Sequence, residues 1–363
     1  MKILCLKDFE EYAKKNLDSK AWAFYSQGAE REITLKENLD CFTRYTLIPR
    51  MLRNTSKTDL TATVLGERVS MPIGISPMAH QRLAHPDGEI AASRGKAASE
   101  AGIIYTLSTL SNTSIQDVST HRPNDTPLFM QLYVFKDRAC TRRIIERAES
   151  CGYKALVLTV DRPVIGLQLR IGTVHFVPPP HLSAPNIDYA LNKNTVSGEY
   201  TYKHALLEDR LTWKDVAWIK SLTKLPLVLK GILTVEDAQE AVKHGASAVW
   251  ISNHGGRQLD GVHTAMDVLP EIASALTGTG CEVFVDGGVR WGTDVLKALA
   301  LGANAVFVGR PILYALNHSG QDGVSSALEI LRNELDKAMH LAGCNSIREI
   351  GPHSVQKRQL AKI

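Results

Sequence analysis

Eight short apolar runs, each followed by a helix-like stretch or a long connection, restrict the fold of this 363-residue chain more than any other feature. They begin near residue 70 and are rich in Val, Ile and Leu, which is typical of parallel strands buried on both faces. The runs are PIGIS from Pro72, IIYTLS from Ile103, LFMQLYV from Leu128, ALVLTV from Ala155, LPLVLK from Leu225, SAVWIS from Ser247, EVFVDG from Glu282 and AVFVG from Ala305.

Helix-like segments lie between these runs, and several end in the Gly that commonly follows a helix. They include GEIAASRGKAASEAG, RIIERAESCG, VEDAQEAVKHG, MDVLPEIASAL and GTDVLKALALG. An open doubly wound sheet is the alternative, but its GxGxxG turn is absent after the first run. The pattern predicts an α/β fold, a (β/α)8 TIM barrel, as one domain over residues 1–363.

Two stretches depart from an even repeat. Residues 1–70 are mostly helical in pattern, and we expect them to form a helical cap on a barrel built by residues 71–363. The connection after the fourth run contains VPPPHLSAPN and NKNTVSGEYTY and is far longer than an ordinary strand–helix loop. We predict that it forms a mobile, lid-like loop over the strand ends.

The composition, with 44% hydrophobic and 22% charged residues, is typical of a globular enzyme. The net charge of +4 is spread along the chain, which argues against a nucleic-acid partner. Six cysteines show no metal-ligand spacing, so we expect reduced thiols and no metal site. No apolar run approaches the roughly 18 residues needed to span a bilayer, and the N-terminus becomes charged too early for a signal peptide.

The tripeptide Ala361-Lys362-Ile363 resembles degenerate forms of the Ser-Lys-Leu peroxisomal address. It predicts recognition by a peroxisomal import receptor, with the cytoplasm as the alternative location.

Polar groups follow nearly every predicted strand, at the barrel end where TIM-barrel enzymes carry their chemistry. A lone Ser or Thr there is more often a satisfied core group, but the whole set indicates a site. The set comprises Ser76-Pro77-Met78-Ala79, Ser108, Gln131 with Tyr133, Thr159 with Asp161, Lys230, Ser252-Asn253-His254, Asp286-Gly287-Gly288 and Gly309-Arg310.

The segments after the seventh and eighth strands predict a phosphate site. Glycines allow backbone N–H groups to approach an anion, and Arg290 and Arg310 supply two guanidinium groups. Lys230, near the barrel axis, requires an anionic or electron-rich partner such as a reduced flavin, unless its side chain extends to solvent.

The segment Ser252-Asn253-His254-Gly255-Gly256-Arg257 is the densest signal. Its glycines predict a tight turn that projects an imidazole and a guanidinium into the same space. The imidazole of His254 can move a proton, and the guanidinium of Arg257 can bind a carboxylate.

These residues resemble the FMN-dependent L-2-hydroxy acid oxidase family, which includes glycolate oxidase and long-chain hydroxy acid oxidase. The resemblance covers the whole chain. Its blocks are GAEREITLKEN, RMLRN, QLYVFKDR, LTVDRP, LKGILT, SNHGGRQLDG, GVRWGTDVLKALALGA and VFVGRPI.

The resemblance implies that His254 accepts a substrate proton, Asp161 stabilises the imidazolium and Tyr133 contacts the substrate hydroxyl. It implies that Arg257 binds the carboxylate and that the chain forms a homotetramer. It also implies an FMN site. The residues of that site would be Pro77, Met78, Ala79, Ser108, Gln131, Thr159, Lys230 and Ser252 around the ring and ribityl chain, and Asp286, Gly287, Gly288, Arg290, Gly309 and Arg310 toward the phosphate.

Three substrate positions depart from the short-chain members of that family. Phe24 stands where they have a substrate-facing tyrosine, and Leu110 stands where glycolate oxidases carry a bulky aromatic side chain. Gln168 stands in place of a second carboxylate-binding arginine, a loss that could cost roughly 1.5 to 3 kcal/mol. Arg170 is a candidate replacement, although on a strand it would be displaced by about 6 to 7 Å.

We therefore predict an (S)-2-hydroxy acid oxidase that uses FMN and O2, produces hydrogen peroxide, and prefers medium, long-chain or aromatic substrates to glycolate. The alternative is a flavoprotein of the same fold with altered or lost hydroxy acid activity: a non-acid substrate, a non-redox role or binding alone. A third hypothesis is a barrel that binds a phosphate ligand without FMN.

Overall fold

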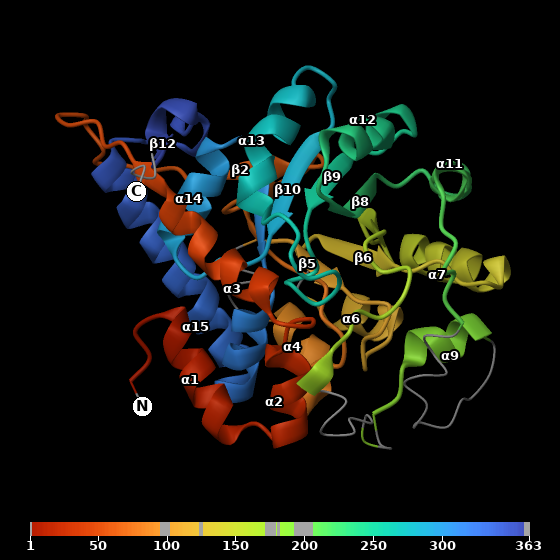
Figure 1. Cartoon of the computed structure of the whole chain (residues 1–363). Coiled ribbons are helices and arrows are strands. Elements are labelled where there is room, and N and C mark those ends of the chain that lie inside the picture. Colours follow the sequence, from red (N-terminus) through yellow and green to blue (C-terminus); the bar gives the residue numbers. More distant parts are fainter. Residues whose placement is uncertain are drawn as a thin grey trace.

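The computed structural model describes residues 2–94, 102–122, 126–170, 179, 182–191 and 206–358. Eight parallel strands close into a barrel, in the order in which the sequence predicts them (Figure 1). The strands are β4 (Ile73–Ile75), β5 (Tyr105–Leu107), β6 (Leu128–Leu132), β7 (Ala155–Thr159), β8 (Leu227–Ile232), β9 (Ala248–Ile251), β10 (Glu282–Asp286) and β11 (Ala305–Val308). The last strand pairs with the first, Val306 opposite Ile73, which excludes the open sheet.

Helices surround the barrel on its outer side (Figure 1). They are α4 (Gly88–Arg94), α6 (Ile115–His121), α7 (Arg138–Ser150), α11 (Trp213–Leu222), α12 (Val235–Lys243), α13 (Ala265–Ala275), α14 (Gly292–Ala300) and α15 (Arg310–Ala342). Local sequence sets their ends. The Thr234 side chain accepts a hydrogen bond from the Asp237 N–H at the start of α12, and Gly245, with φ of +80°, follows its end.

Aromatic side chains fill the barrel interior. The rings of Trp250 and Phe307 have centroids 3.9 Å apart, and Phe284 packs against both. The hairpin of β2 (Ala62–Val64) and β3 (Glu67–Val69) contributes two buried valines to the same cluster. Its Leu65 N–H donates to Glu282 at the start of β10, so the hairpin closes the amino-terminal end of the barrel.

The predicted helical cap is confirmed for α1 (Leu6–Asn16), α2 (Ser19–Ser26) and α3 (Ile33–Asp40). The helical pattern is wrong for residues 45–70, where β1 (Tyr45–Leu47) pairs with β12 (Val355–Lys357) and the β2–β3 hairpin follows. β1 forms because the distant β12 pairs with it, whereas β2 and β3 pair with each other across a local turn. Short 3-10 turns occur at η1 (Cys41–Arg44), η2 (Gln81–Leu83), η3 (Ile347–Glu349) and η4 (Pro352–Ser354).

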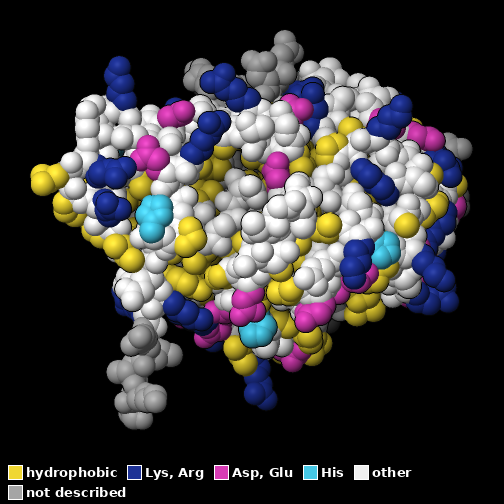
Figure 2. Space-filling view, turned by 90° about the horizontal axis from the view of Figure 1, so that it is seen from above, with side chains coloured by type: hydrophobic (Ala, Val, Ile, Leu, Met, Phe, Trp, Pro, Cys, Tyr) yellow, Lys and Arg dark blue, Asp and Glu magenta, His cyan; other side chains and the backbone are white. Residues whose placement is uncertain are grey.

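The long connection after β7 is partly described. It includes residues 160–170, α9 (Pro185–Leu191) and the segment that leads into α11. Part of the predicted lid, residues 171–178, 180–181 and 192–205, lies outside the described residues, as does Ala361-Lys362-Ile363. Among the helices that the structure describes, none is long and apolar enough to cross a membrane. Figure 2 shows basic and acidic side chains interspersed on one face of the molecule.

Candidate active site

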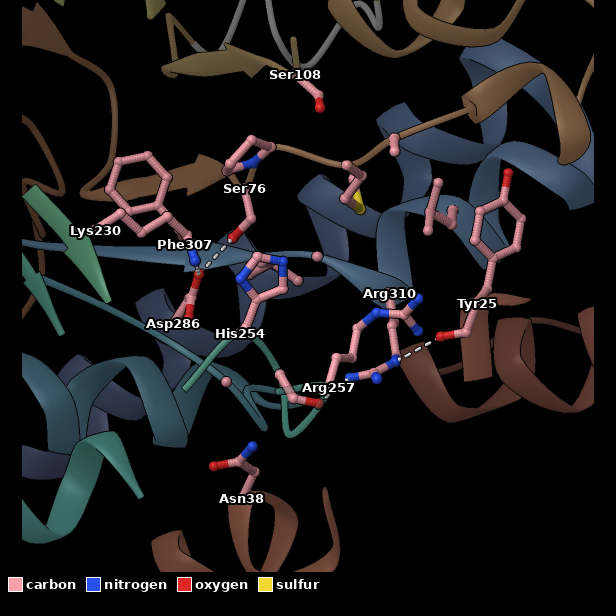
Figure 3. A pocket seen from close by; sticks show the side chains of 18 of the residues that line it. Tyr25, Asn38, Ser76, Ser108, Lys230, His254, Arg257, Asp286, Phe307 and Arg310 are labelled. Atoms are coloured by element: carbon pink, nitrogen blue, oxygen red, sulfur yellow. Dashed lines mark hydrogen bonds and ion pairs between the residues drawn. The ribbon is translucent and has the colours of Figure 1, made fainter. Parts of the chain in front are cut away.

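The carboxyl ends of all eight strands open into one cavity of about 1240 Å³, which includes its mouth toward solvent. Most of the residues that the sequence predicts for the site line this cavity, and Figure 3 shows several of them. They are Phe24, Pro77, Met78, Ala79, Ser108, Leu110, Gln131, Tyr133, Thr159, Gln168, Lys230, His254, Arg257, Asp286, Gly287, Gly288, Arg290, Gly309 and Arg310.

Three predicted residues lie behind or outside this lining. Asp161 and Ser252 contact lining side chains from behind. Arg170 does not reach the cavity: its Nε donates to the Glu32 carboxylate at 3.1 Å, and its side chain is 44% exposed. Arg170, the candidate replacement for the missing arginine, is thus held by Glu32 of the cap and is not among the lining residues.

His254 and Asp161 form a buried pair. The Nδ1 of His254 lies 2.8 Å from Oδ1 of Asp161. Burial lowers the pKa of His254 and outweighs the opposite effect of Asp161, so the imidazole is neutral near pH 7. Burial would raise the pKa of Asp161, but His254 and nearby cations keep it below its usual value. Because an ionised carboxylate only accepts hydrogen bonds, Nδ1 carries the proton and Nε2 is left as the basic nitrogen.

The backbone at His254 is left-handed, with φ of +58°, and Gly255 and Gly256 continue at +64° and +71°. Such a conformation costs a non-glycine residue about 1 to 3 kcal/mol. Contacts to the preceding residues offset this cost: the His254 N–H donates to the Ser252 hydroxyl, and the Gly256 N–H donates to Asn253 Oδ1.

The N-terminal segment holds this loop from the other side. The amides of Asn38 and Asn253 exchange two hydrogen bonds of 2.9 and 2.8 Å. Asp260 accepts from the N–H groups of Ile33 and Thr34 and so caps α3. The sequence prediction missed the roles of Asn38 and Asp260, because their partners are more than 200 residues away.

Lys230 is buried in an ion pair rather than extended to solvent. Its Nζ lies 2.8 Å from the Ser252 hydroxyl and 3.2 Å from Oδ2 of Asp286, with both charged side chains less than 10% exposed. Burial opposes the charge, but Asp286 and Asp161 raise the pKa of Lys230, so the ammonium stays protonated. Figure 3 shows Lys230, Asp286 and His254 around the same space.

A chain of hydrogen bonds connects the next strand ends. The Gln131 side chain donates to Thr159 Oγ1 at 3.0 Å and accepts from the Thr109 N–H at 3.0 Å and the Ser108 hydroxyl at 3.3 Å. These contacts fix one orientation of the amide and present a polar wall beside Lys230.

The opposite end of the cavity is suited to a phosphate. Gly287 and Gly288 have φ of +100° and +83°, and a Cβ on Gly288 would lie 1.6 Å from the Asn38 carbonyl oxygen. The amino terminus of α15 begins beside them at Arg310. Arg290 lines the same end.

The Arg310 side chain has a further structural role that sequence did not predict. Its guanidinium donates to the carbonyls of Tyr25, Gln27 and Gly255 at 2.8, 2.8 and 2.9 Å. Arg310 therefore joins α2 to the His254 loop, and it also lines the cavity.

The cavity thus combines a glycine-rich cationic end, a polar wall, a buried ammonium and a neutral imidazole on a TIM barrel. These features fit FMN, because a helix terminus with nearby cations suits its phosphate and Lys230 suits a ring that gains negative charge. They define the class of barrel oxidoreductases that use a flavin mononucleotide.

Comparisons with known proteins identify the family. The chain matches the FMN-dependent dehydrogenase family over residues 13–357. It is 45% identical to human 2-hydroxyacid oxidase 1, over 99% of this chain and 98% of that protein. It is 46% identical to L-lactate oxidase of Nostoc sp., over 95% and 96%. A solved structure of a mandelate oxidase variant with (S)-mandelic acid superposes with a TM-score of 0.89 at 39% identity, over 99% and 100%. The chain belongs to the FMN-dependent dehydrogenase family, as the sequence resemblance indicated, and FMN is its cofactor.

The fit of the phosphate end can be tested with Gly288→Ala. We expect this variant to lose most of its bound FMN and to unfold at a lower temperature, because the new Cβ meets backbone that cannot move without shifting α3. Gly278→Ala is the matched control, since Gly278 has φ of +79° but open space around it. The flavin-to-protein absorbance ratio and the thermal midpoint measure both effects. Equal losses of FMN and of thermal stability in the two variants would show that backbone strain, and not the contact with Asn38, causes the effect.

Proposed function

We propose that the chain oxidises a medium, long-chain or aromatic L-2-hydroxy acid to the 2-oxo acid and passes the electrons to O2, which yields hydrogen peroxide. The observation that carries this proposal is the neutral His254, held by Asp161, in one cavity with Arg257. The names of the relatives support the hydroxy acid class.

His254 is the base in this proposal. Its Nε2 takes a proton from the substrate, either from the hydroxyl or from the α-carbon, and Asp161 stabilises the imidazolium that results. FMN, when bound, accepts the two electrons of the oxidation. The charge of Lys230, buried beside Asp286, offsets the negative charge that these electrons bring.

Arg257 binds the substrate carboxylate in this proposal. One of its Nη atoms donates to the Phe24 and Gln27 carbonyls at 2.7 and 3.2 Å, and its Cζ lies 5.3 Å from the centroid of the Phe24 ring. Gln168 donates from its amide to the Arg257 carbonyl at 3.2 Å, so it supports the loop that carries the guanidinium.

The preference for larger substrates rests on the apolar side of the cavity. Phe24 and Leu110 line it with side chains that are each 4% exposed, and neither offers a hydrogen-bond donor. An apolar substrate side chain therefore gains more here than the hydrogen of glycolate would.

A panel of hydroxy acids tests this proposal. Under anaerobic conditions we expect (S)-mandelate and L-2-hydroxyoctanoate to bleach the flavin absorbance at lower concentrations than glycolate, because their side chains bury apolar surface. Leu110→Trp fills part of that space and should weaken the two larger substrates while it spares glycolate. Protein that no hydroxy acid reduces would refute the proposed reaction.

Replacing Asp161 tests the assignment of the base. In Asp161→Asn the carboxylate no longer raises the pKa of His254, so that pKa falls further. Since the base acts in its neutral form, the acidic limb of the kcat/KM profile should move to lower pH. We expect kcat to fall about 100-fold or more because the imidazolium loses its partner. An acidic limb at higher pH would contradict the assignment, and FMN content controls for folding.

A second candidate function, activity on a non-acid substrate or no turnover, is favoured by Gln168. The variant Gln168→Arg separates the two. If the native site already binds carboxylates, the KM for L-lactate should change less than about tenfold. This factor corresponds to the lower limit of the free energy that one charged hydrogen bond contributes. If Gln168→Arg instead raises activity on small hydroxy acids by much more than tenfold, the result would favour the second candidate function.

Peroxisomal import and the homotetramer stay predictions. Deleting Ala361-Lys362-Ile363 from a fluorescent fusion addresses the first, and the mass of the holoenzyme in solution addresses the second.

A further inference from the structure

We propose that Arg162 is the second carboxylate-binding residue of this site and that the substrate carboxylate lies between Arg162 and Arg257. The inference rests on the proposed oxidation of a 2-hydroxy acid. Arg162 follows Asp161 directly at the end of β7, and its side chain lines the same cavity as His254.

The Arg162 guanidinium is fixed beside a residue that faces the substrate space. One Nη donates to the Tyr133 hydroxyl at 3.2 Å, and the guanidinium carbon lies 5.2 Å from the centroid of the Tyr133 ring. Tyr133 itself lines the cavity and is largely buried. A planar guanidinium held in this way presents a bidentate donor pair, which is the geometry that a carboxylate prefers.

The cations that line the cavity favour an anionic ligand. Lys230 pairs with Asp286, Arg290 pairs with Glu10, and the Arg310 guanidinium donates to the carbonyls of Tyr25, Gln27 and Gly255. Arg162 and Arg257 line the same cavity as His254. A bound carboxylate would therefore meet two guanidinium groups close to the base.

The other basic candidate does not serve this role. Arg170 pairs with Glu32 and donates to the Ser26 hydroxyl outside the cavity. Gln168 lines the cavity but carries no charge. Arg162 thus supplies the positive charge that Gln168 lacks, from a different position in the same loop. Arg162 also determines specificity for acids over their uncharged analogues, because an uncharged ligand gains less binding free energy from the guanidinium.

The test compares holoenzyme variants with a charged and a neutral ligand of the same shape. We measure KM for (S)-mandelate and for its amide, and the dissociation constant of oxalate from the change in flavin absorbance. Arg162→Gln should weaken mandelate and oxalate about 10- to 100-fold, the value of one charged hydrogen bond, and change the amide less than threefold. Arg162→Lys should recover part of the loss.

Arg170→Gln is the matched control, because it removes an arginine from the same loop outside the cavity. It should leave all three constants within twofold. Equal losses for acid and amide in Arg162→Gln would show that Arg162 only positions Tyr133, and unchanged oxalate binding would overturn the proposal. If the wild-type protein binds oxalate through Arg162 but is reduced by no hydroxy acid, the proposed oxidation fails while the anion site stands.

The double variant Arg162→Gln with Gln168→Arg adds a rescue experiment. A cation at position 168 should restore most of the oxalate affinity, since it returns a second charge to the same cavity. If the double variant retains FMN but does not recover oxalate affinity, the result would contradict the proposal that positions 162 and 168 can supply the same charge.

Discussion

Closure of the barrel is the constraint on which the rest of the structure depends. Once β11 pairs with β4, the carboxyl ends of all eight strands surround one opening. Closure brings residues that are far apart in sequence into contact: the Ser76 hydroxyl after β4 lies 3.4 Å from Asp286 at the end of β10. The aromatic cluster of Trp250, Phe284 and Phe307 supports this closure from inside, because it fills the space that the strands enclose.

The N-terminal segment is part of the site as well as a cover for it. Asn38 pairs with Asn253, α3 takes its cap from Asp260, and Arg310 donates to carbonyls on both sides of the same junction. The left-handed His254 is stable because these contacts hold its loop on two sides. The geometry of His254 therefore depends on the packing of α2 and α3 against the barrel.

Several charged side chains line the cavity. Lys230 and Asp286 neutralise each other in its buried part, so an ammonium can stay protonated there. Arg290, Arg310, Arg257 and Arg162 line the same cavity, and the guanidinium groups of Arg257 and Arg310 both donate to the Gln27 carbonyl. The proposed sites for the cofactor and for the substrate carboxylate both lie within this cavity.

The sequence by itself determined the eight strands, the FMN-binding class and the pair of His254 and Arg257. These features depend on local periodicity and on motifs in which neighbouring residues act together. Only the tertiary structure decided that residues 45–70 form strands, that Arg170 pairs with Glu32, that Asn38 and Asp260 fix the loop, and that Arg162 reaches Tyr133. Apart from the local β2–β3 hairpin, these contacts join segments that are separated in sequence, so their geometry exists only in the folded chain.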